Sequence, residues 1–210
     1  MPRLVYLLAF PAVLSAQLFS VGVKGGVPAS DAFDTVRTGN LSYFSDTKRY
    51  LAGGTIELRL PVVGVEFDAL YRRLNYATSA GPGGLCPTCG PFTASTSANS
   101  WEFPLLLKLR GTSETVRPFV AGGPSFRTLS DVRQFITDPL GRRETDDPAE
   151  LSNRASVGLT LGAGLELGRR FRVVPEVRYT RWGWENFQSP ALPQFRNNQN
   201  QVDVLVGIHF

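Results

Sequence analysis

Alternation of apolar and polar residues is the main pattern along this chain. In residues 63–72 the odd positions are apolar or aromatic, whereas the even positions include Glu66, Asp68 and Arg72. Successive side chains of a β-strand point to opposite faces, so a period of two predicts a strand whose faces lie in different media. The same alternation returns in residues 101–110, 157–167, 173–180 and 201–210. These five segments are the clear strands of the sequence.

Three further segments have a weaker period of two. Residues 19–27 and 51–60 alternate over part of their length, and residues 117–128 contain Pro118 and Pro124, which leave the facing of that segment ambiguous. The sequence therefore predicts eight strands, most of them close to the ~9–11 residues of a tilted transmembrane β-strand. Beyond the first residues, the chain has no apolar run of the ~18 residues that a transmembrane helix needs.

The connections between these strands alternate in length. The short ones are residues 60–62, 111–116 and 168–170, and the long, polar ones are residues 28–49, 75–100, 129–155 and 183–200. Structureless loops beyond ~12–15 residues are uncommon in compact soluble domains. Outer-membrane barrels, in contrast, combine short periplasmic turns with longer extracellular loops and an even number of strands. We therefore predict an all-β fold: an eight-stranded antiparallel up-and-down transmembrane β-barrel with short periplasmic turns and four long extracellular loops.

The distribution of charge indicates which face points inward. The apolar faces of the five clear strands carry no charged residue, and Arg or Lys at the bilayer midplane costs ~2–4 kcal/mol. The opposite faces combine acids, bases and glycines, which suits a lumen plugged by paired charges, because an eight-stranded barrel is just wide enough for side chains. We expect Gly158, Gly162 and Gly164 to leave space there for arginines. The predicted lumen charge network is Glu57, Arg59, Glu66, Asp68, Arg72, Glu102, Lys108, Arg110, Glu166, Glu176, Arg178 and Asp203.

Aromatic residues near the strand ends give weaker support for a membrane barrel, because strands favour aromatic residues in any case. Amphipathic rings at these places fit the interfacial girdles of outer-membrane barrels. The expected girdle residues are Phe19, Tyr71, Trp101, Phe171, Tyr179, Trp182, Trp184 and Phe210.

The first residues have the layout of a secretory signal peptide. Arg3 gives a positive start, residues 4–14 are an apolar run too short to span a bilayer, and Ser15 and Ala16 form a small-residue cleavage region. We therefore expect a signal peptide over residues 1–16 and a barrel domain over residues 17–210. The formal net charge of +4 comes from interleaved acids and bases, so the basic surface of a nucleic-acid-binding protein is missing.

Several short motifs follow one another in a fixed order: FSVGVKGGV at 19–27, WEFPLLLK at 101–108, PFVAGGP at 118–124, GAGLE at 162–166, EVRY at 176–179 and the closing segment 202–210. In this order they resemble small bacterial outer-membrane barrels of the PorT-like and OmpX-like kind. The resemblance implies a C-terminal assembly signal, in which Val206, Ile208 and the terminal Phe210 are read by the outer-membrane assembly machinery. It implies no single activity, because such barrels serve as adhesins, stabilising proteins, assembly factors and occasionally enzymes.

Candidate reactive residues are few. Cys86 and Cys89 are the only cysteines. A thioredoxin-type site would need a βαβ context, and a zinc site would need more ligands. Because an exported compartment favours oxidation, we expect a disulfide in the second long loop, with two free thiols as the alternative. His209 alternates with the apolar residues of the last strand, so it is expected to face the lumen, and we interpret it as a structural residue. The acids of the third loop are interpreted as solvated rather than as a calcium or lipopolysaccharide site; they are Asp131, Asp138, Asp146, Asp147 and Glu150.

The sequence thus predicts a non-enzymatic, monomeric outer-membrane barrel without cofactors. We expect it to contact outer-membrane lipids and the assembly machinery, and either to rigidify the membrane or to present its long loops to an extracellular partner whose identity the sequence does not give. Two alternatives stay open. One is a soluble exported lipocalin-like barrel that binds a small apolar ligand. The other is an outer-membrane enzyme that hydrolyses lipids or peptides, which would require loop acids and hydroxyls to converge.

Overall fold

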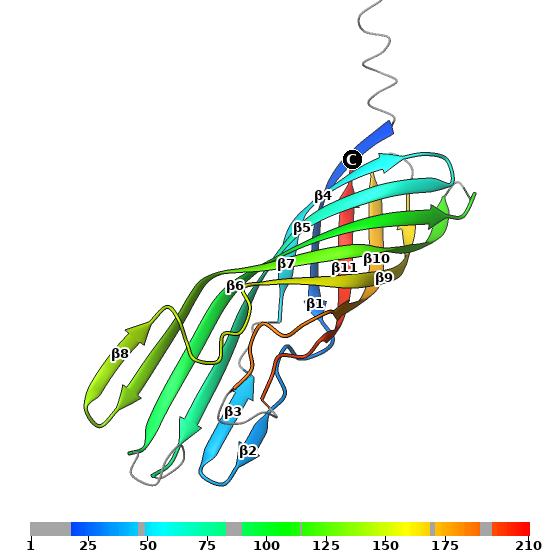
Figure 1. The fold of residues 1–210 in the computed structure, drawn as a ribbon. Helices are drawn as coiled ribbons and strands as arrows, with labels where there is room; N and C mark the ends of the chain where they lie inside the picture. The colour runs from blue at the N-terminus through cyan, green and yellow to red at the C-terminus, as the bar shows by residue number, and fades with distance from the viewer. Residues whose placement is uncertain (1–17, 46–48, 83–89, 114, 169–170, 190–194) are drawn as a thin grey trace, which may run out of the picture.

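The computed structural model describes residues 18–45, 49–82, 90–113, 115–168, 171–189 and 195–210. In these ranges the chain forms one sheet of eleven strands, and every strand pair in it is antiparallel (Figure 1). The described residues include no helix that is long and apolar enough to cross a membrane. The predicted signal peptide, residues 1–16, lies outside the described residues.

Eight of the strands pair in a closed ring. The ring closes because β11 pairs with β1, from Gly22 opposite His209 to Pro28 opposite Asp203. All eight predicted strands are present, and each pairs with the strands on both sides of it. In order around the ring they are β1 (Phe19–Pro28), β4 (Leu51–Arg59), β5 (Val63–Ala80), β6 (Phe92–Arg110), β7 (Val116–Asp138), β9 (Ala155–Leu167), β10 (Arg172–Trp182) and β11 (Asn200–His209).

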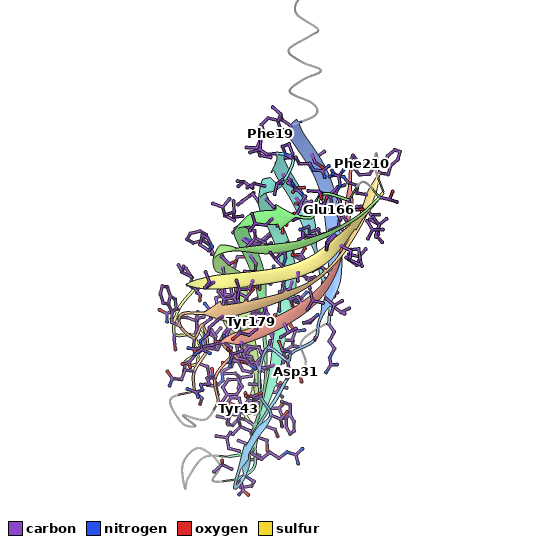
Figure 2. All side chains as sticks on the ribbon, turned by 90° about the vertical axis from the view of Figure 1, so that its right-hand side faces the viewer. Phe19, Asp31, Tyr43, Glu166, Tyr179 and Phe210 are labelled. Carbon is purple, nitrogen blue, oxygen red and sulfur yellow. The ribbon has the colours of Figure 1, made fainter. Side chains whose placement is uncertain are left out.

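The two ends of the ring differ. At the end that we call the turn end, short connections follow β4, β6 and β9, and Phe19 and Phe210 lie there (Figure 2). Gly168, which directly follows β9, has a φ of +102°, a conformation that favours glycine. At the opposite end, the loop end, β5, β6 and β7 continue past the other ring strands (Figure 1).

The continuation of these three strands forms a second part of the sheet. β5, β6 and β7 have 18, 19 and 23 residues, whereas the other five ring strands have 9 to 13. Their far halves pair with the hairpin of β2 (Val36–Thr38) and β3 (Leu41–Ser45) and with β8 (Gly141–Thr145). We call this part the extended sheet. Three of the four long connections predicted as loops therefore contain strands, which the sequence prediction did not include.

β7 keeps a regular register past its two prolines, which settles the facing that the sequence left ambiguous. Its pairing with β9 continues without a shift over Val116–Thr128. Phe119 is buried and Val120 is exposed. The irregularity lies farther along, where the pairing with β6 shifts after Ser97 and Asp131 has a φ of +49°. This β-bulge lies where the ring passes into the extended sheet.

Burial divides each ring strand into an outward and an inward face. Val204 and Leu161 are 42% and 56% exposed, whereas the adjacent Asp203 and Thr160 are 3% and 1% exposed. The five clear strands face as the alternation predicts. We call the outward side chains of the ring strands the apolar belt; its members include Val21, Ile56, Val65, Phe67, Leu105, Leu107, Val120, Leu159, Leu161, Val173, Val177, Val204, Val206 and Ile208.

Candidate functional site

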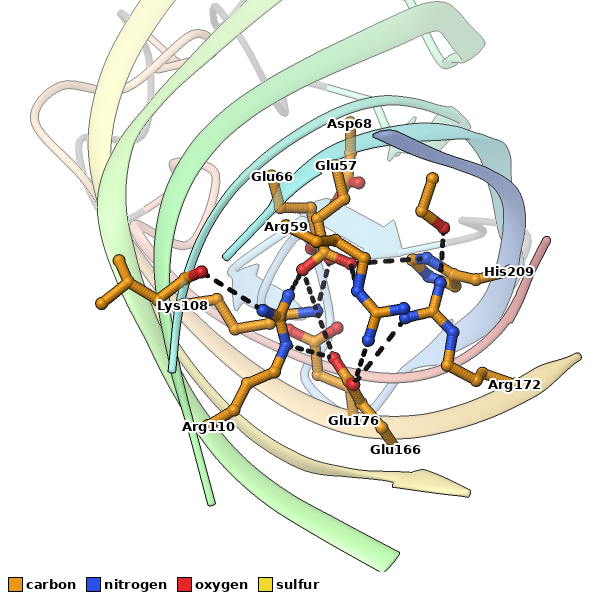
Figure 3. Close-up of polar contacts among 12 residues, drawn as sticks. Glu57, Arg59, Glu66, Asp68, Lys108, Arg110, Glu166, Arg172, Glu176 and His209 are labelled. Carbon is orange, nitrogen blue, oxygen red and sulfur yellow. Dashed lines mark hydrogen bonds and ion pairs between the residues drawn. The ribbon is translucent and has the colours of Figure 1, made fainter. Parts of the chain in front are cut away.

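Charged side chains from seven of the eight ring strands meet inside the ring near the turn end (Figure 3). This group, the turn-side cluster, has six cations, five carboxylates and one histidine, and ion pairs join its members. They are Lys24, Arg59, Lys108, Arg110, Arg172 and Arg178, with Glu57, Glu66, Asp68, Glu166, Glu176 and His209.

Glu66 accepts hydrogen bonds from three cations of the turn-side cluster. Its Oε1 accepts hydrogen bonds from Lys24 Nζ at 2.5 Å and from Arg178 Nη2 at 2.8 Å. Its Oε2 accepts one from Lys108 Nζ at 2.6 Å. Glu66 is fully buried, so its charge is balanced by these cations rather than by water. A buried charge is tolerated only when it is paired and hydrogen-bonded in this way.

Nearer the turn end, Arg110 joins two acids from different strands. Its Nε donates to Glu166 Oε1 at 2.8 Å, and its guanidinium also pairs with Glu57. Arg59 Nη2 donates to the other oxygen of Glu166 at 3.0 Å. His209 Nδ1 lies 3.8 Å from Glu57 Oε2, which places the histidine among structural charges, as the sequence interpretation expected.

A second group, the loop-side cluster, lies on the inward positions closer to the loop end. It consists of Arg72, Glu102, Arg127 and Asp203. Arg72 Nε lies 3.1 Å from Glu102 Oε1, and Arg72 Nη2 lies 3.1 Å from Asp203 Oδ1. Arg127 Nη2 lies 3.2 Å from Glu102 Oε1. Two cations therefore balance two carboxylates, each at most 6% exposed.

Trp182 corrects one expectation about the aromatic girdle. It points into the ring and is only 1% exposed. The Arg127 guanidinium lies over its ring at 3.8 Å from the centroid, and its Nε1 donates to Gln201 Oε1 at 2.9 Å. Trp182 has the same parity as the inward Arg178, so the period of two would have excluded it from the outer surface. The other seven expected girdle residues are not buried.

Glycines on the inward face of β9 make room for larger side chains. A Cβ on Gly162 would lie 2.8 Å from Glu176 Oε1 and 3.4 Å from Arg178 Cγ. A Cβ on Gly164 would lie 2.7 Å from the Phe119 ring. A Cβ on Gly158 would lie 2.9 Å from the ring of Trp182. The expectation of space for arginines thus applies to Gly162 alone, and the other two glycines accommodate aromatic rings.

All twelve residues of the predicted charge network lie on inward positions, and the structure brings them into the two clusters. Arg59 is the most accessible of them, with a side chain 18% exposed at the turn end. Sequence reasoning left Lys24, Arg127 and Arg172 out of the network. Lys24 and Arg172 have the inward parity of their strands and could have been found from it. Arg127 could not, because the facing of its strand was ambiguous.

The inner side of the extended sheet carries a separate aromatic core. Phe33, Tyr43, Tyr76, Phe187 and Phe195 are each at most 2% exposed. The rings of Tyr43 and Phe195 stack at 4.0 Å, and Phe33 and Tyr76 lie 5.1 Å apart. Phe33, Phe187 and Phe195 come from the connections between strands, so these connections fold over the sheet. We call this group the cap core.

One acid of the third loop lies in this region, against expectation. Glu150 is 9% exposed rather than solvated; it lies 3.4 Å from the Tyr43 hydroxyl and accepts a hydrogen bond from Gln134 at 3.2 Å. Tyr43 also bonds Ser189 at 2.9 Å. Burial raises the pKa of the Tyr43 phenol. Acid and hydroxyls therefore converge, but Tyr43 and Ser189 are each only 2% exposed, so a substrate in solvent cannot reach them directly.

The residues of the expected assembly signal point outward. Val206, Ile208 and Phe210 are 49%, 44% and 58% exposed, and the Phe210 ring packs edge-on against Phe171 at 5.6 Å. Their reading by the assembly machinery stays a prediction. Cys86 and Cys89 lie outside the described residues.

An apolar belt outside and balanced charges inside invert the arrangement of a soluble protein. In a closed ring every strand has two partners, so no backbone edge faces lipid, and together these features define a membrane-spanning β-barrel. The sequence matches the outer membrane protein beta-barrel domain family over residues 15–184, and the chain belongs to that family. It is a protein of the cell outer membrane.

The solved structure of OprG has the same fold, and the chain is also similar to two other solved outer-membrane proteins. OprG from Pseudomonas aeruginosa is 16% identical, with a TM-score of 0.51 over 91% of this chain and 95% of that one. Neisserial surface protein A is 9% identical, with a TM-score of 0.43 over 91% and 95%. Ail from Yersinia pestis is 12% identical, with a TM-score of 0.33 over 91% and 99%. The family match and the fold shared with OprG confirm the resemblance to small outer-membrane barrels. No curated protein sequence matches the chain.

Proposed function

We propose that this protein is a non-enzymatic outer-membrane barrel with a closed lumen, which presents its extended sheet outside the cell as a contact surface for an external partner. The observation that carries the proposal is the continuation of β5, β6 and β7 past the ring. Short periplasmic turns and long extracellular connections are the usual arrangement of such barrels, so the loop end is assigned to the outside.

The extended sheet is suited to binding because it is already folded. The cap core fixes the connections that fold over it, and the pairing of β5 with β6 continues to the end of β5, where Ala80 lies opposite Phe92. A surface ordered before binding loses less conformational freedom on association than a flexible loop does. Its free edge at β8 carries Arg142, Arg143 and Glu144, and charges of this kind discourage pairing with other strands.

Nothing in the described residues favours the two alternative functions. A lipocalin-like barrel would need apolar side chains lining its interior, whereas the interior here is occupied by the two charge clusters. A hydrolase would need an acid and a hydroxyl that a substrate can reach, whereas the group around Glu150 is buried.

Labelling of single cysteines tests which end of the barrel lies outside. Leu140 is 94% exposed beside β8 at the loop end, and Val62 is 48% exposed in a connection at the turn end. In a Cys86→Ser/Cys89→Ser background, a membrane-impermeant maleimide should label Leu140→Cys in intact cells. It should label Val62→Cys only after the outer membrane is permeabilised. The reverse pattern would place the extended sheet in the periplasm and refute the proposal.

Conductance in planar bilayers tests the closed lumen. Two voids in the region of the loop-side cluster, one beside Arg72 and Arg127 and one beside Glu102 and Asp203, have a volume of about 10 Å³ each. A void of that size holds about one water molecule. The purified protein should therefore give no stable channel. Long-lived openings at moderate voltage would show that the charge clusters do not close the barrel.

A further inference from the structure

The outward face of the barrel carries a group of three polar side chains where the apolar belt ends toward the loop end. On β5 the Tyr71 hydroxyl donates to Asn99 Oδ1 on β6 at 2.9 Å. Arg73 is the next outward residue of β5, two residues nearer the loop end than Tyr71, and it lies opposite Asn99 in the strand pairing. Tyr71 itself pairs with Trp101, with ring centroids 5.3 Å apart. A tyrosine, an arginine and an asparagine thus lie together where the belt ends.

The same group recurs on the opposite side of the ring. On β10 the Tyr179 hydroxyl donates to Asn200 Oδ1 on β11 at 2.7 Å. Arg181 is again the next outward residue, pairs with Asn200, and donates to the same oxygen from Nη1 at 2.7 Å. β5 and β10 are four strands apart in a ring of eight. Figure 2 shows Tyr179 between the end marked by Phe210 and the end marked by Tyr43.

Both arginines have unused binding capacity. Within the described residues neither Arg73 nor Arg181 makes an ion pair with a carboxylate, whereas the nearby Arg133 pairs with Asp131 at 2.8 Å. Asn99 also donates to that aspartate at 3.5 Å, but Arg133 neutralises its charge. Each arginine is therefore exposed and has no carboxylate partner among the described residues, although Nη1 of Arg181 already donates to Asn200.

A polar hollow of about 400 Å³ opens beside Arg181. Arg196 and Asn200 line it together with two acids, Asp34 and Glu185. The Glu185 carboxylate already has partners within the protein: Arg196 Nη1 donates to its Oε1 at 3.3 Å, and Gln199 Nε2 lies 3.5 Å from the same oxygen. The hollow is large enough for a headgroup, and it lies at the end of the belt strands that carry Val177 and Val204.

We propose that these two groups, Tyr71–Arg73–Asn99 and Tyr179–Arg181–Asn200, bind the anionic phosphate headgroups of membrane lipids in the leaflet at the loop end. The planar guanidinium matches a phosphate with two parallel hydrogen bonds. Tyrosine and tryptophan rings lie at the level of lipid headgroups, so an arginine one outward residue beyond them is at the height of the phosphate. The acyl chains of the same lipid would lie along the apolar belt. The proposal does not depend on what the extended sheet contacts.

Native mass spectrometry of the purified protein tests this inference. The protein in neutral detergent is titrated with phosphatidylglycerol, with zwitterionic phosphatidylcholine and with inorganic phosphate alone. We expect phosphatidylglycerol to be retained in preference to the other two. The double variant Arg73→Gln/Arg181→Gln should weaken that retention about tenfold, which corresponds to the loss of roughly 1.4 kcal/mol of charge-assisted hydrogen bonding.

The matched control is Arg37→Gln/Arg142→Gln, which removes two exposed charges from the extended sheet, away from the belt. It should retain phosphatidylglycerol as the unmodified protein does. Equal weakening in the control would show general attraction to a cation and overturn the proposal. Equal retention of phosphatidylcholine, or inorganic phosphate bound as tightly as the lipid, would also overturn it. If the double variant does not fold, shown by loss of the heat-dependent shift in gel mobility, Arg181→Gln alone is compared with Arg142→Gln.

Discussion

Replacement of Leu161 by arginine should destabilise the barrel by about 2–4 kcal/mol and reduce its assembly in the outer membrane. Leu161 points outward from the middle of β9 and is 56% exposed. Its strand partners are Gly122 on β7 and Tyr179 on β10. The guanidinium would therefore enter the apolar belt, in which neither strand partner of Leu161 is an acid that could pair with it.

Leu140→Arg is the matched control, because it makes the same chemical change at a residue that is 94% exposed beyond the ring. It should leave stability within about 0.5 kcal/mol of the unmodified protein. The measurements are urea unfolding in lipid vesicles and the heat-dependent shift in gel mobility of the outer-membrane fraction. Equal stability of the two variants would mean that Leu161 does not face lipid, and would contradict the assignment of the apolar belt.

Replacement of Glu66 by glutamine should cost about 3–5 kcal/mol, the usual effect of removing one partner from a buried ion pair. The amide keeps the size of the side chain but not its charge. Lys24, Lys108 and Arg178 would then lose the acid that they share. The six cations of the turn-side cluster would then face four carboxylates instead of five. Water could reach the unpaired cations only if the ring opened.

Glu144→Gln on β8 is the control for charge loss as such. Its carboxylate lies 4.0 Å from the Arg133 guanidinium, and both side chains are about half exposed, at 48% and 52%. Exposed pairs contribute only about 0–1 kcal/mol, so this variant should unfold at nearly the same urea concentration as the unmodified protein. If Glu66→Gln were as mild as Glu144→Gln, the turn-side cluster would have to be hydrated, and the closed lumen would be untenable.

The strands inside the membrane were predictable because the two media on either side of the barrel wall impose different residue types. At Val204 and Asp203 this difference fixes which side chain points outward, and the same holds along the five clear strands. The far halves of β5, β6 and β7 leave the membrane, so their outward positions no longer need to be apolar. Segments such as Thr93–Asn99 are rich in small polar residues and resemble loops, although they pair as strands.

Most members of the charge network were predictable, but its connections were not. Parity alone assigns Glu66 and Asp68 to the lumen. It does not show that Glu66 is shared by cations from β1, β6 and β10, because those contacts depend on which strands lie across the ring. The cap core was missed for a similar reason. Phe33, Phe187 and Phe195 lie in irregular connections, where no period indicates burial.

The sequence by itself determined the ring strands, the inward and outward faces of the five clear strands and most charges of the lumen, because alternation is a local property that one strand shows alone. Only the tertiary structure decided the pairing of the charges, the inward position of Arg127 on β7 and the burial of Glu150. It also revealed the repeated tyrosine, arginine and asparagine groups on opposite walls. These features join residues far apart in the chain, and their energies depend on distances between strands that a one-dimensional pattern does not contain.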